Sequence, residues 1–449
     1  MTEIEGQSVL VLGLGVSGVS AARFLAERGA RVVAADERAP DAIGGLEDLP
    51  DAVEVRVGQA FPDLDPFDLV VPSPGVPAAR YADAARRAWG DIELCYRALQ
   101  VPIVAVTGTN GKSTVVRLIE AMARGAGLRA RAAGNLGIPA LELVGAPLDL
   151  AILEVSSFQL ESVDAFQPRV GLLLNVSPDH LDRHGDLAGY LAAKARLFAR
   201  QGEGDTAIVN QDDPACAGLA LPEGVTRLAF SRRAPVEAGA WLDGGAIVLR
   251  RRGRIERFPL DGLDAFLTQP DNLLAALLAL STFDVDLGAA LGALAGFEGL
   301  PHRCETVGEV RGVRYVDDSK ATNVGAAARA LEGFDRPIVW IAGGRHKGGD
   351  LSLLAKTATG RARRALLIGE AADAFAEALG SDVPSERVGD LDTAVERAAA
   401  IAHAGDVVLL APACASFDQF ASFEARGRAF RAAVERLEGG RAPRGGERA

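Results

Sequence analysis

Short runs of apolar, β-branched residues alternate with longer Ala-, Leu- and Arg-rich stretches along nearly the whole chain. The short runs predict strands and the longer stretches predict helices, and this alternation is typical of parallel α/β architecture. The predicted strands cover residues 8–12, 32–35, 69–72, 103–106, 151–155, 170–175, 207–210, 313–316, 338–342, 365–368 and 407–411. Helices are expected between them, most clearly over residues 115–126 and 272–281.

The chain has 449 residues, which is too long for one ordinary hydrophobic core. We therefore expect three domains, covering residues 1–98, 99–299 and 300–449. Gly299-Leu300-Pro301-His302 is the expected hinge before the last domain, because a proline stops the preceding helix. Each of the three segments is long enough to form its own core.

Composition narrows the class of protein. Hydrophobic residues make up 49% of the chain and charged residues 24%, which is typical of a soluble globular protein. The net charge of -12 argues against nucleic acid or an anionic membrane as the main partner. Any phosphate ligand must then be held by helix N-termini and a few placed cations.

The expected location is the cytoplasm, and we expect a monomer. Residues 1–7 contain Glu3 and Glu5 but no basic segment, so no secretory leader is predicted, and no apolar run reaches membrane-spanning length. The four cysteines are too widely spaced to suggest a metal site or a disulfide framework. They are Cys95, Cys216, Cys304 and Cys414.

A glycine-rich turn follows the first predicted strand and opens a helix. Its sequence is Gly13-Leu14-Gly15-Val16-Ser17-Gly18, and Asp36 ends the next predicted strand. Such a turn brings backbone close to an anionic ligand, and an acid at that place can bind a ribose or a base. The pattern leaves three alternatives open: NAD, another nucleotide, or a tight turn without a ligand.

The strongest motif is Thr107-Gly108-Thr109-Asn110-Gly111-Lys112-Ser113-Thr114, between an apolar strand and a helix. Backbone N–H groups in such a loop cradle phosphates, a lysine reaches the terminal phosphates, and a hydroxyl ligates Mg²⁺. The spacing departs from the common phosphate loop because Val106 replaces its first glycine. A turn that binds no phosphate is the alternative.

Further polar groups follow the strands of the central segment. Glu154 ends a very apolar strand, where a carboxylate near a phosphate loop suits a hard cation, although a solvated acid is the alternative. Residues 175–184, Asn-Val-Ser-Pro-Asp-His-Leu-Asp-Arg-His, contain two of the five histidines. Their spacing is equally compatible with a site and with a capping or surface role, and Lys194 on the next helix would by itself suggest only a solvated side chain.

Three polar loops follow three strands of the last segment. They are Asp317-Asp318-Ser319-Lys320-Ala321-Thr322-Asn323, Gly343-Gly344-Arg345-His346-Lys347 and the loop over residues 413–420. Loops at the carboxyl ends of parallel strands meet at one edge of the sheet, so together they predict a crevice for an anionic ligand. Taken singly, each loop is also compatible with ordinary turn chemistry.

These motifs together resemble the Mur ligases, and most closely the members that add D-glutamate. The resemblance covers the whole chain in the family's order. It rests on GTNGKST at residues 108–114, EVSSFQLE at 154–161, NVSPDHLDRH at 175–184, His302-Arg303, DDSKATN at 317–323, and PACASFDQF with FExRG over 412–427. It implies a Rossmann-like N-terminal domain, a central phosphate-loop domain with a mostly parallel sheet, and a Rossmann-like C-terminal domain.

The resemblance implies an ATP-dependent amide ligase of peptidoglycan precursor synthesis. Its substrates would be UDP-N-acetylmuramoyl-L-alanine and D-glutamate, with ATP bound between the second and third domains. ATP phosphorylates the terminal carboxylate, and the incoming amine attacks the acyl phosphate. Two Mg²⁺ ions are expected to offset the crowded negative charge.

The resemblance also assigns residues to roles. Lys112 would hold the terminal phosphates, Ser113 and Glu154 would bind one Mg²⁺, His180 would bind the second, and Lys194 would be carbamylated. ATP contacts are expected at Gly108, Thr109, Asn110, Gly111, Lys112, Ser113, Thr114, Asn272, Arg303 and Asp318. The UDP portion would meet Leu14, Val16, Ser17, Asp36, Ser73 and Gly75, and the muramoyl part would meet Asn135, Gln159 and His180. The D-glutamate pocket would comprise Lys320, Thr322, Lys347, Ser416 and Phe423.

The chain departs from the family in three places. Thr268-Gln269 replaces a His-Asn pair before the helix that contacts ATP, the loop between His180 and Lys194 is compressed, and Arg345-His346 is unusual beside Lys347. The rival hypotheses are a sister ligase for another amino acid, a folylpolyglutamate synthetase, an NAD-dependent oxidoreductase and a non-enzymatic nucleotide-binding module. The resemblance favours UDP over NAD at the first turn, and the motifs of the last segment disfavour both other ligases.

Overall fold

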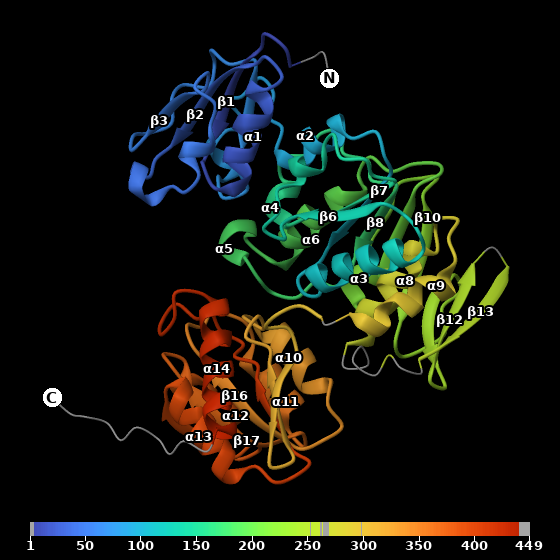
Figure 1. Ribbon diagram of the computed structural model, residues 1–449, viewed down its shortest axis with the longest axis vertical. Helices are drawn as coiled ribbons and strands as arrows, with labels where there is room; N and C mark the ends of the chain where they lie inside the picture. The colour runs from blue at the N-terminus through green and yellow to red at the C-terminus, as the bar shows by residue number, and fades with distance from the viewer. Residues whose placement is uncertain (1–3, 252, 261–262, 264–268, 298, 440–449) are drawn as a thin grey trace. The chain divides into compact units, whose positions relative to one another are not determined.

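The computed structural model describes residues 4–251, 253–260, 263, 269–297 and 299–439. In this part of the chain, three β-sheets with flanking helices form two compact units (Figure 1). The first two sheets belong to one unit, which ends at Phe297. The third sheet belongs to the other unit, which also includes Ser177–Asp179. The α/β fold with three mostly parallel sheets confirms the predicted fold class, whereas the predicted domain boundaries stay a prediction.

The first sheet has four parallel strands in the order β3-β2-β1-β4. β1 lies between β2 and β4, so the turn that follows β1 opens at the centre of the sheet's carboxyl edge. The strands are β1 (Ser8–Leu12), β2 (Arg31–Asp36), β3 (Glu54–Val57) and β4 (Leu69–Pro72).

The second sheet has nine described strands in the order β13-β12-β11-β10-β9-β8-β5-β7-β6. The strands from β6 to β11 are parallel, while β12 and β13 are antiparallel additions at one edge. They are β5 (Ile103–Thr107), β6 (Ala130–Gly134), β7 (Leu150–Glu154), β8 (Val170–Leu173), β9 (Thr206–Asn210), β10 (Thr226–Ser231), β11 (Gly239–Asp243), β12 (Ala246–Arg251) and β13 (Arg254–Pro259).

The third sheet has six described strands in the order β14-β15-β19-β16-β17-β18. Only β14 is antiparallel to its neighbour, so β15, β19 and β16 place their carboxyl ends side by side. The strands are β14 (Glu305–Val310), β15 (Val313–Asp317), β16 (Ile338–Gly343), β17 (Ala362–Ile368), β18 (Ser385–Gly389) and β19 (Val407–Leu410).

Helices connect the parallel strands in all three sheets. The α-helices are α1 (Val16–Ala26), α2 (Asp91–Ala98), α3 (Lys112–Gly125), α4 (Ser157–Leu160), α5 (Leu181–His184), α6 (Leu187–Ala195), α7 (Pro214–Ala217), α8 (Pro270–Leu280), α9 (Leu287–Gly292), α10 (Val324–Glu332), α11 (Leu351–Ala358), α12 (Ala372–Leu379), α13 (Leu391–Ile401) and α14 (Phe423–Glu438). The 3₁₀ helices are η1 (Pro40–Ala42), η2 (Leu46–Asp48), η3 (Ala78–Arg80), η4 (Ala140–Leu143), η5 (Arg196–Phe198) and η7 (Ala293–Gly296).

The strands predicted from sequence all exist, with ends that shift by up to three residues. The predicted start of one helix was wrong. Helix α3 begins at Lys112, three residues before the predicted start at residue 115. Gly111 caps the helix in the left-handed conformation, with φ of 87°, and this lets the chain enter the helix earlier than the apolar pattern suggests. Lys112, Ser113 and Thr114 therefore lie in the first helical turn.

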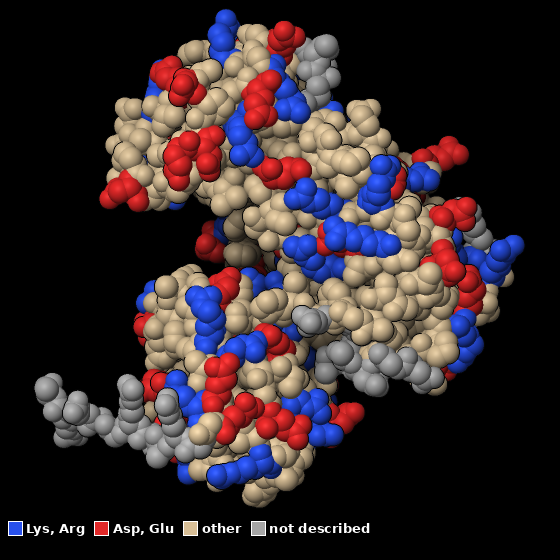
Figure 2. All heavy atoms as spheres, in the orientation of Figure 1, with Lys and Arg blue, Asp and Glu red and all other residues tan. Residues whose placement is uncertain are grey.

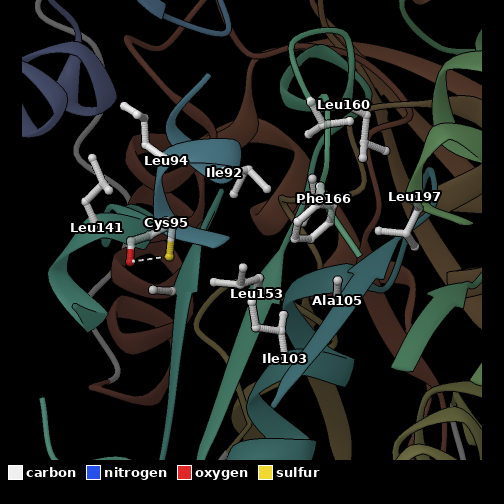
Figure 3. Packing of buried hydrophobic residues seen from close by; sticks show 14 of the residues in the cluster. Ile92, Leu94, Cys95, Ile103, Ala105, Leu141, Leu153, Leu160, Phe166 and Leu197 are labelled. Atoms are coloured by element: carbon white, nitrogen blue, oxygen red, sulfur yellow. Dashed lines mark hydrogen bonds between the residues drawn. The ribbon is translucent and has the colours of Figure 1, made fainter. Parts of the chain in front are cut away.

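Helix α2 joins the first sheet to the second through an apolar face. Ile92, Leu94 and Cys95 are fully buried, and they pack near Leu141 and Leu153 of the second sheet's layer (Figure 3). The Cys95 thiol also donates a hydrogen bond of 3.2 Å to the Ala140 carbonyl. Burial raises the pKa of this thiol, so Cys95 serves as a small core residue.

Glu93, also on α2, is a fully buried carboxylate with a structural role. It accepts backbone hydrogen bonds from Asp164, Ala165 and Phe166 at 2.9 to 3.0 Å, and one from the Arg97 side chain at 2.6 Å. The carboxylate therefore satisfies three N–H groups of a loop that would otherwise lack acceptors.

We expect Glu93→Ala to lower the free energy of unfolding by about 3 to 5 kcal/mol, because it leaves three buried N–H groups without an acceptor and removes one of the two acids that pair with Arg97. Asp164→Ala is the matched control, since Asp164 pairs with the same Arg97 at 3.0 Å but its side chain is 51% exposed. It should cost less than about 1 kcal/mol. Urea denaturation of both variants measures the difference, and equal losses would contradict this account of Glu93.

Candidate functional site

The loop after β5 has the geometry of a phosphate cradle. Gly108 and Gly111 have φ values of 150° and 87°, which L side chains rarely adopt. A Cβ at Gly111 would also lie 2.5 Å from the Asn272 side-chain oxygen, and one at Gly108 would lie 3.0 Å from the Cβ of Leu174. The glycines are therefore required by both conformation and space, and Asn272, a predicted ATP contact, packs directly against the loop.

Two lysines converge on this loop. The Lys112 ammonium group donates to the carbonyl oxygens of Gly108 and Thr109, both at 2.9 Å. Lys194, from α6, is only 1% exposed and donates to the same Gly108 oxygen at 2.8 Å. Its ammonium nitrogen also lies 4.2 Å from the centre of the Tyr190 ring. The structure thus brings together two cations that the sequence places 82 residues apart.

Asn175 holds the loop in place, a role that the motif alone does not reveal. Its side chain accepts a hydrogen bond from the Asn110 N–H at 2.9 Å and donates one to the Asn110 carbonyl at 2.8 Å. Its backbone carbonyl accepts from the Thr109 N–H at 2.9 Å. Asn175 follows β8, which pairs with β5, so the neighbouring strand fixes the cradle.

Glu154 provides a candidate cation ligand beside the loop. It ends β7, next to β5, and is 2% exposed. One carboxylate oxygen accepts from the Asn135 side chain at 2.8 Å, whereas the other has no hydrogen-bond partner among the described residues. The buried hydroxyl of Thr107, at the end of β5, also has none there. Unpartnered buried oxygens are unfavourable without a ligand, and hard oxygen donors suit Mg²⁺.

The two histidines of the 175–184 segment have different environments. His180 is exposed, has the left-handed φ of 55°, and packs edge-on against Phe158 at 4.8 Å between ring centres. The His184 ring is hydrogen-bonded to the Ser157 hydroxyl at 3.0 Å, and burial lowers its pKa. His180 therefore has an accessible ring for the predicted metal contact, which stays a prediction.

In the first sheet, Asp36 organises the glycine-rich turn. Its carboxylate accepts from the Leu14 N–H at 2.6 Å and from the Arg38 side chain at 2.7 and 3.0 Å. The Arg38 guanidinium lowers the pKa of Asp36 to about 2. The Ser73 hydroxyl donates to the Gly13 carbonyl at 2.6 Å from the other side of the turn. A direct contact of Asp36 with nucleotide stays a prediction, because both of its oxygens already accept hydrogen bonds.

A cavity of about 460 Å³ lies beside this turn. It is lined by two residues predicted to contact UDP, Leu14 and Val16, and by residues for which the sequence suggested no ligand contact. Val16 is a 66% exposed apolar side chain, as expected for a surface that meets a flat ligand. The other residues that line the cavity include Arg23, Arg38, Asp48, Pro139 and Glu142.

In the second unit, backbone hydrogen bonds join the three predicted loops. Arg345 and Ala415 exchange hydrogen bonds of 2.9 and 3.0 Å, and the Ala413 N–H donates to the Ala321 carbonyl at 2.8 Å. These bonds connect the ends of β15, β16 and β19. The Arg345 side chain, part of the unusual Arg345-His346 pair, is directed to Glu370, with hydrogen bonds of 3.0 and 3.2 Å.

Some residues of the predicted D-glutamate pocket lie together. The Lys320 ammonium group lies 3.9 Å from the centre of the Phe423 ring, and the Phe423 carbonyl accepts from the Ser319 hydroxyl at 2.9 Å. Ser416 is 2% exposed and its carbonyl caps the turn that follows. Thr322 is half-buried on the first loop, and Lys347 is exposed on the second.

Arg426, which received no role from the sequence, connects two of these loops. It is 1% exposed and donates to the Ser319 carbonyl and hydroxyl at 2.9 Å and to the Cys414 carbonyl at 3.1 Å. Burial lowers the pKa of this guanidinium to about 10. The next residue must be glycine, because a Cβ at Gly427 would lie 2.1 Å from the His302 ring.

Asp318 and Arg303, the remaining predicted ATP contacts, belong to the second unit. Burial raises the pKa of Asp318 to about 7, and the charge of Arg303 opposes that rise. Asp318 also accepts from the Cys304 N–H at 3.3 Å. Gln269 donates to the Cys304 sulfur at 3.3 Å, while Thr268 lies outside the described residues. Contacts of these residues with ATP stay a prediction.

Figure 2 shows acidic and basic side chains interspersed over the visible face, without a large area of one sign. Within the part of the chain that the structure describes, no helix is both long and apolar enough to span a membrane.

The comparisons with known proteins match this arrangement. The Mur ligase MurD-like N-terminal domain matches residues 7–90, the Mur ligase middle domain residues 106–250, and the Mur ligase glutamate ligase domain residues 302–414. A fold of three mostly parallel sheets with a phosphate loop at the end of β5 defines a nucleotide-dependent enzyme of the α/β class. The chain belongs to the Mur ligase family.

Its relatives include UDP-N-acetylmuramoylalanine–D-glutamate ligases. The protein of that name from Geobacter metallireducens is 43% identical over 98% of this chain and 100% of its own. The one from Anaeromyxobacter dehalogenans is 45% identical over 96% of this chain and 97% of its own.

Solved structures share the fold at low identity. A MurF ligase from Thermotoga maritima in complex with ADP has a TM-score of 0.61 at 17% identity, covering 98% of this chain and 97% of its own. A pseudomurein peptide ligase type C from Methanothermus fervidus has a TM-score of 0.62 at 16% identity, covering 96% of this chain and 100% of its own.

The raised pKa of Asp318 predicts a pH-dependent stability effect. Between its ordinary value of 3.8 and about 7, the folded state holds a proton that the unfolded state has lost, so this group makes the protein less stable as pH rises. We expect Asp318→Asn to gain thermal stability relative to the wild type as pH rises through that window. Melting temperatures from about pH 5.5 to about 8.5 measure the effect.

Asp36→Asn is the control for this experiment. Because the pKa of Asp36 is lowered to about 2, its contribution is already complete above its ordinary value of 3.8. The variant should therefore lose a constant amount of stability across the same pH range. A difference between Asp318→Asn and wild type that does not change with pH would contradict the account of Asp318.

Proposed function

We propose that this chain is the ligase that joins D-glutamate to UDP-N-acetylmuramoyl-L-alanine at the expense of ATP, in peptidoglycan precursor synthesis. The observation that carries the proposal is the 43% identity, over 98% of the chain, to a relative named for that activity. The phosphate cradle with two converging lysines supports it independently.

The first step makes the carboxylate of the UDP-linked acid reactive. A carboxylate oxygen attacks the terminal phosphorus of ATP, the bond from that phosphorus to the bridging oxygen breaks, and ADP leaves. Lys112 and the N–H groups at the start of α3 stabilise the charge on the transferred phosphoryl group. Gly108, Thr109, Asn110, Gly111, Ser113 and Thr114 form the rest of the cradle, and Asn272 packs against it.

The second step forms the amide. The neutral amine of D-glutamate attacks the acyl carbon, the bond to the phosphate oxygen breaks, and inorganic phosphate leaves while the nitrogen loses a proton. Lys320, Thr322, Lys347, Ser416 and the backbone near Phe423 bind the amino acid through its two carboxylates. With both carboxylates anchored, only one enantiomer directs its amine to the acyl carbon, which accounts for a D-specific pocket.

Mg²⁺ fits the residues at the cradle. The unpartnered Glu154 oxygen and the Ser113 hydroxyl are suited to hold one ion, and His180 a second. When bound, Mg²⁺ offsets the negative charge of the phosphates. Asn135 orients the Glu154 carboxylate, and carbamylation of Lys194 would convert a second cation at Gly108 into an anionic group that attracts the ions.

The carbamate proposal predicts a specific rescue. We expect Lys194→Ala to lose about 10³-fold or more in turnover, because the site loses a charged group at the phosphate cradle. Short-chain carboxylates should restore part of the activity by replacing the carbamate. Lys356→Ala, which removes an exposed lysine of α11, is the control and should keep wild-type turnover.

Two outcomes would contradict this role. Full activity of folded Lys194→Ala would exclude any catalytic contribution of the side chain. Loss of activity without rescue by any carboxylate would exclude the carbamate and leave the contact of the unmodified ammonium with Gly108 as the important interaction.

The choice of amino acid tests the whole proposal. Phosphate release is measured with Mg²⁺, ATP and UDP-N-acetylmuramoyl-L-alanine against D-glutamate, L-glutamate, L-alanine and a diamino acid. We expect release above background only with D-glutamate, and only when the UDP-linked acid is present. Lys347→Ala should raise KM for D-glutamate about tenfold or more while KM for ATP stays unchanged. Efficient use of another amino acid would move the chain to a sister ligase.

A further inference from the structure

Helix α2 begins with a buried carboxylate that no role so far explains. Asp91 is 3% exposed, and burial raises its pKa. Within the described residues, its hydrogen-bond donors are the Ile92 N–H and the Gln159 side chain, and neither is a cation. The Ser17 hydroxyl lies beside the carboxylate and opposes the rise in its pKa. Burying a carboxylate without a cationic partner is costly, and an apolar side chain would avoid that cost.

Two of these neighbours are residues proposed to meet the UDP-linked substrate. Ser17 lies in the first turn of α1, where the glycine-rich turn of the first sheet ends. Gln159 lies on α4, which follows the β7 strand of the second sheet, and its side chain donates to Asp91 at 2.9 Å. Asp91 therefore contacts the proposed uridine-binding and muramoyl-binding segments at once.

The hydrogen bonds determine how the Gln159 amide is oriented. Its oxygen accepts from the Ser156 N–H at 3.0 Å and from the Ser156 hydroxyl at 3.1 Å, so its nitrogen must face Asp91. The Ser17 hydroxyl faces the same carboxylate from the first sheet.

An aspartate is suited to this position because the Ile92 N–H and the Gln159 amide donate to its two different oxygens. Carboxylate oxygens accept both bonds without conflict. An asparagine of the same shape would turn an NH₂ group toward one of these donors. The apolar face of α2, with Ile92, Leu94 and Cys95, holds the carboxylate in place against the second sheet (Figure 3).

We infer that Asp91 is a positioning residue that fixes the distance between the uridine end and the muramoyl end of the substrate-binding surface. The inference rests on the proposed function. A long substrate that contacts both sheets is bound well only if both sets of contacts form together, so a residue that joins Ser17 to Gln159 sets their register. A ligand that contacts only the first sheet would not depend on it.

The test compares two ligands by calorimetric titration of the full chain. Asp91→Asn should bind UDP-N-acetylmuramoyl-L-alanine about tenfold or more weakly than wild type, since hydrogen bonds to a charged group are lost. Its affinity for UDP alone should change less than about twofold. In turnover, KM for the UDP-linked acid should rise by the same factor, while KM for ATP and for D-glutamate stays unchanged.

Glu93→Gln is the matched control, because it alters another buried carboxylate of α2, two residues away, whose hydrogen-bond partners among the described residues are Arg97 and the 164–166 backbone. It should lower the melting temperature without changing the ratio of the two affinities. A purely structural role for Asp91 would make both variants behave alike and would overturn the inference, as would an equal weakening of UDP and of the full substrate.

A second variant keeps the test decisive. If Asp91→Asn does not fold, Asp91→Glu retains the charge but moves the carboxylate by one methylene, and it should show the same selective loss for the long ligand. Wild-type titration separates the two proposals. If wild type does not bind the UDP-linked acid, the proposed function fails; if it binds and the Asp91 variants bind equally well, only the positioning role fails.

Discussion

Thr109 and Asn110 keep one conformation because Asn175 pairs with them through both its side chain and its backbone. The proposed contacts of this loop with the phosphates of ATP depend on that pairing. The loop carries φ values that only glycine adopts readily at Gly108 and Gly111, so it would lose its shape without fixed partners. Because Asn175 follows β8, beside β5, the parallel sheet itself supplies the anchor. The shape of the phosphate loop is therefore fixed by the residue that follows the neighbouring strand of the sheet.

The second constraint is electrostatic. A chain with a net charge of -12 attracts anionic substrates only where cations are concentrated locally. Lys112 donates to the Gly108 and Thr109 carbonyls at the cradle, and Lys320 lies over the Phe423 ring. Other cations pair with acids, as Arg38 does with Asp36 and Arg345 does with Glu370.

The sequence predicts those features that local patterns encode. Eleven strand positions, the three polar loops and the phosphate loop follow from apolar runs and the residues directly after them, whereas β3, β6, β10, β11, β12, β13, β14 and β18 were not predicted. Helix α3 starts earlier than predicted because Lys112-Ser113-Thr114 lacks the apolar periodicity by which helices are recognised. The Asp36–Arg38 pair spans only two residues and was within reach of sequence reasoning.

Long-range contacts were not predictable in the same way. Gln159 and Asp91 lie 68 residues apart, and Arg426 and Ser319 lie 107 apart, so no periodicity relates them. The edge strand β13 was missed because it is mostly exposed and rich in charged residues, which hides the apolar pattern of a strand.

The position of Arg426 has an evolutionary consequence. This guanidinium binds the backbone carbonyls of Ser319 and Cys414 from beneath the loops, and it is 1% exposed. Backbone carbonyls are present whatever side chains the loops carry, so these two bonds do not depend on the loop sequence, whereas the bond to the Ser319 hydroxyl does. Mutations can then replace the side chains that project from the loops while the loops keep their course. A single scaffold supported in this way can diverge toward different amino acids without having to evolve a new fold for each of them.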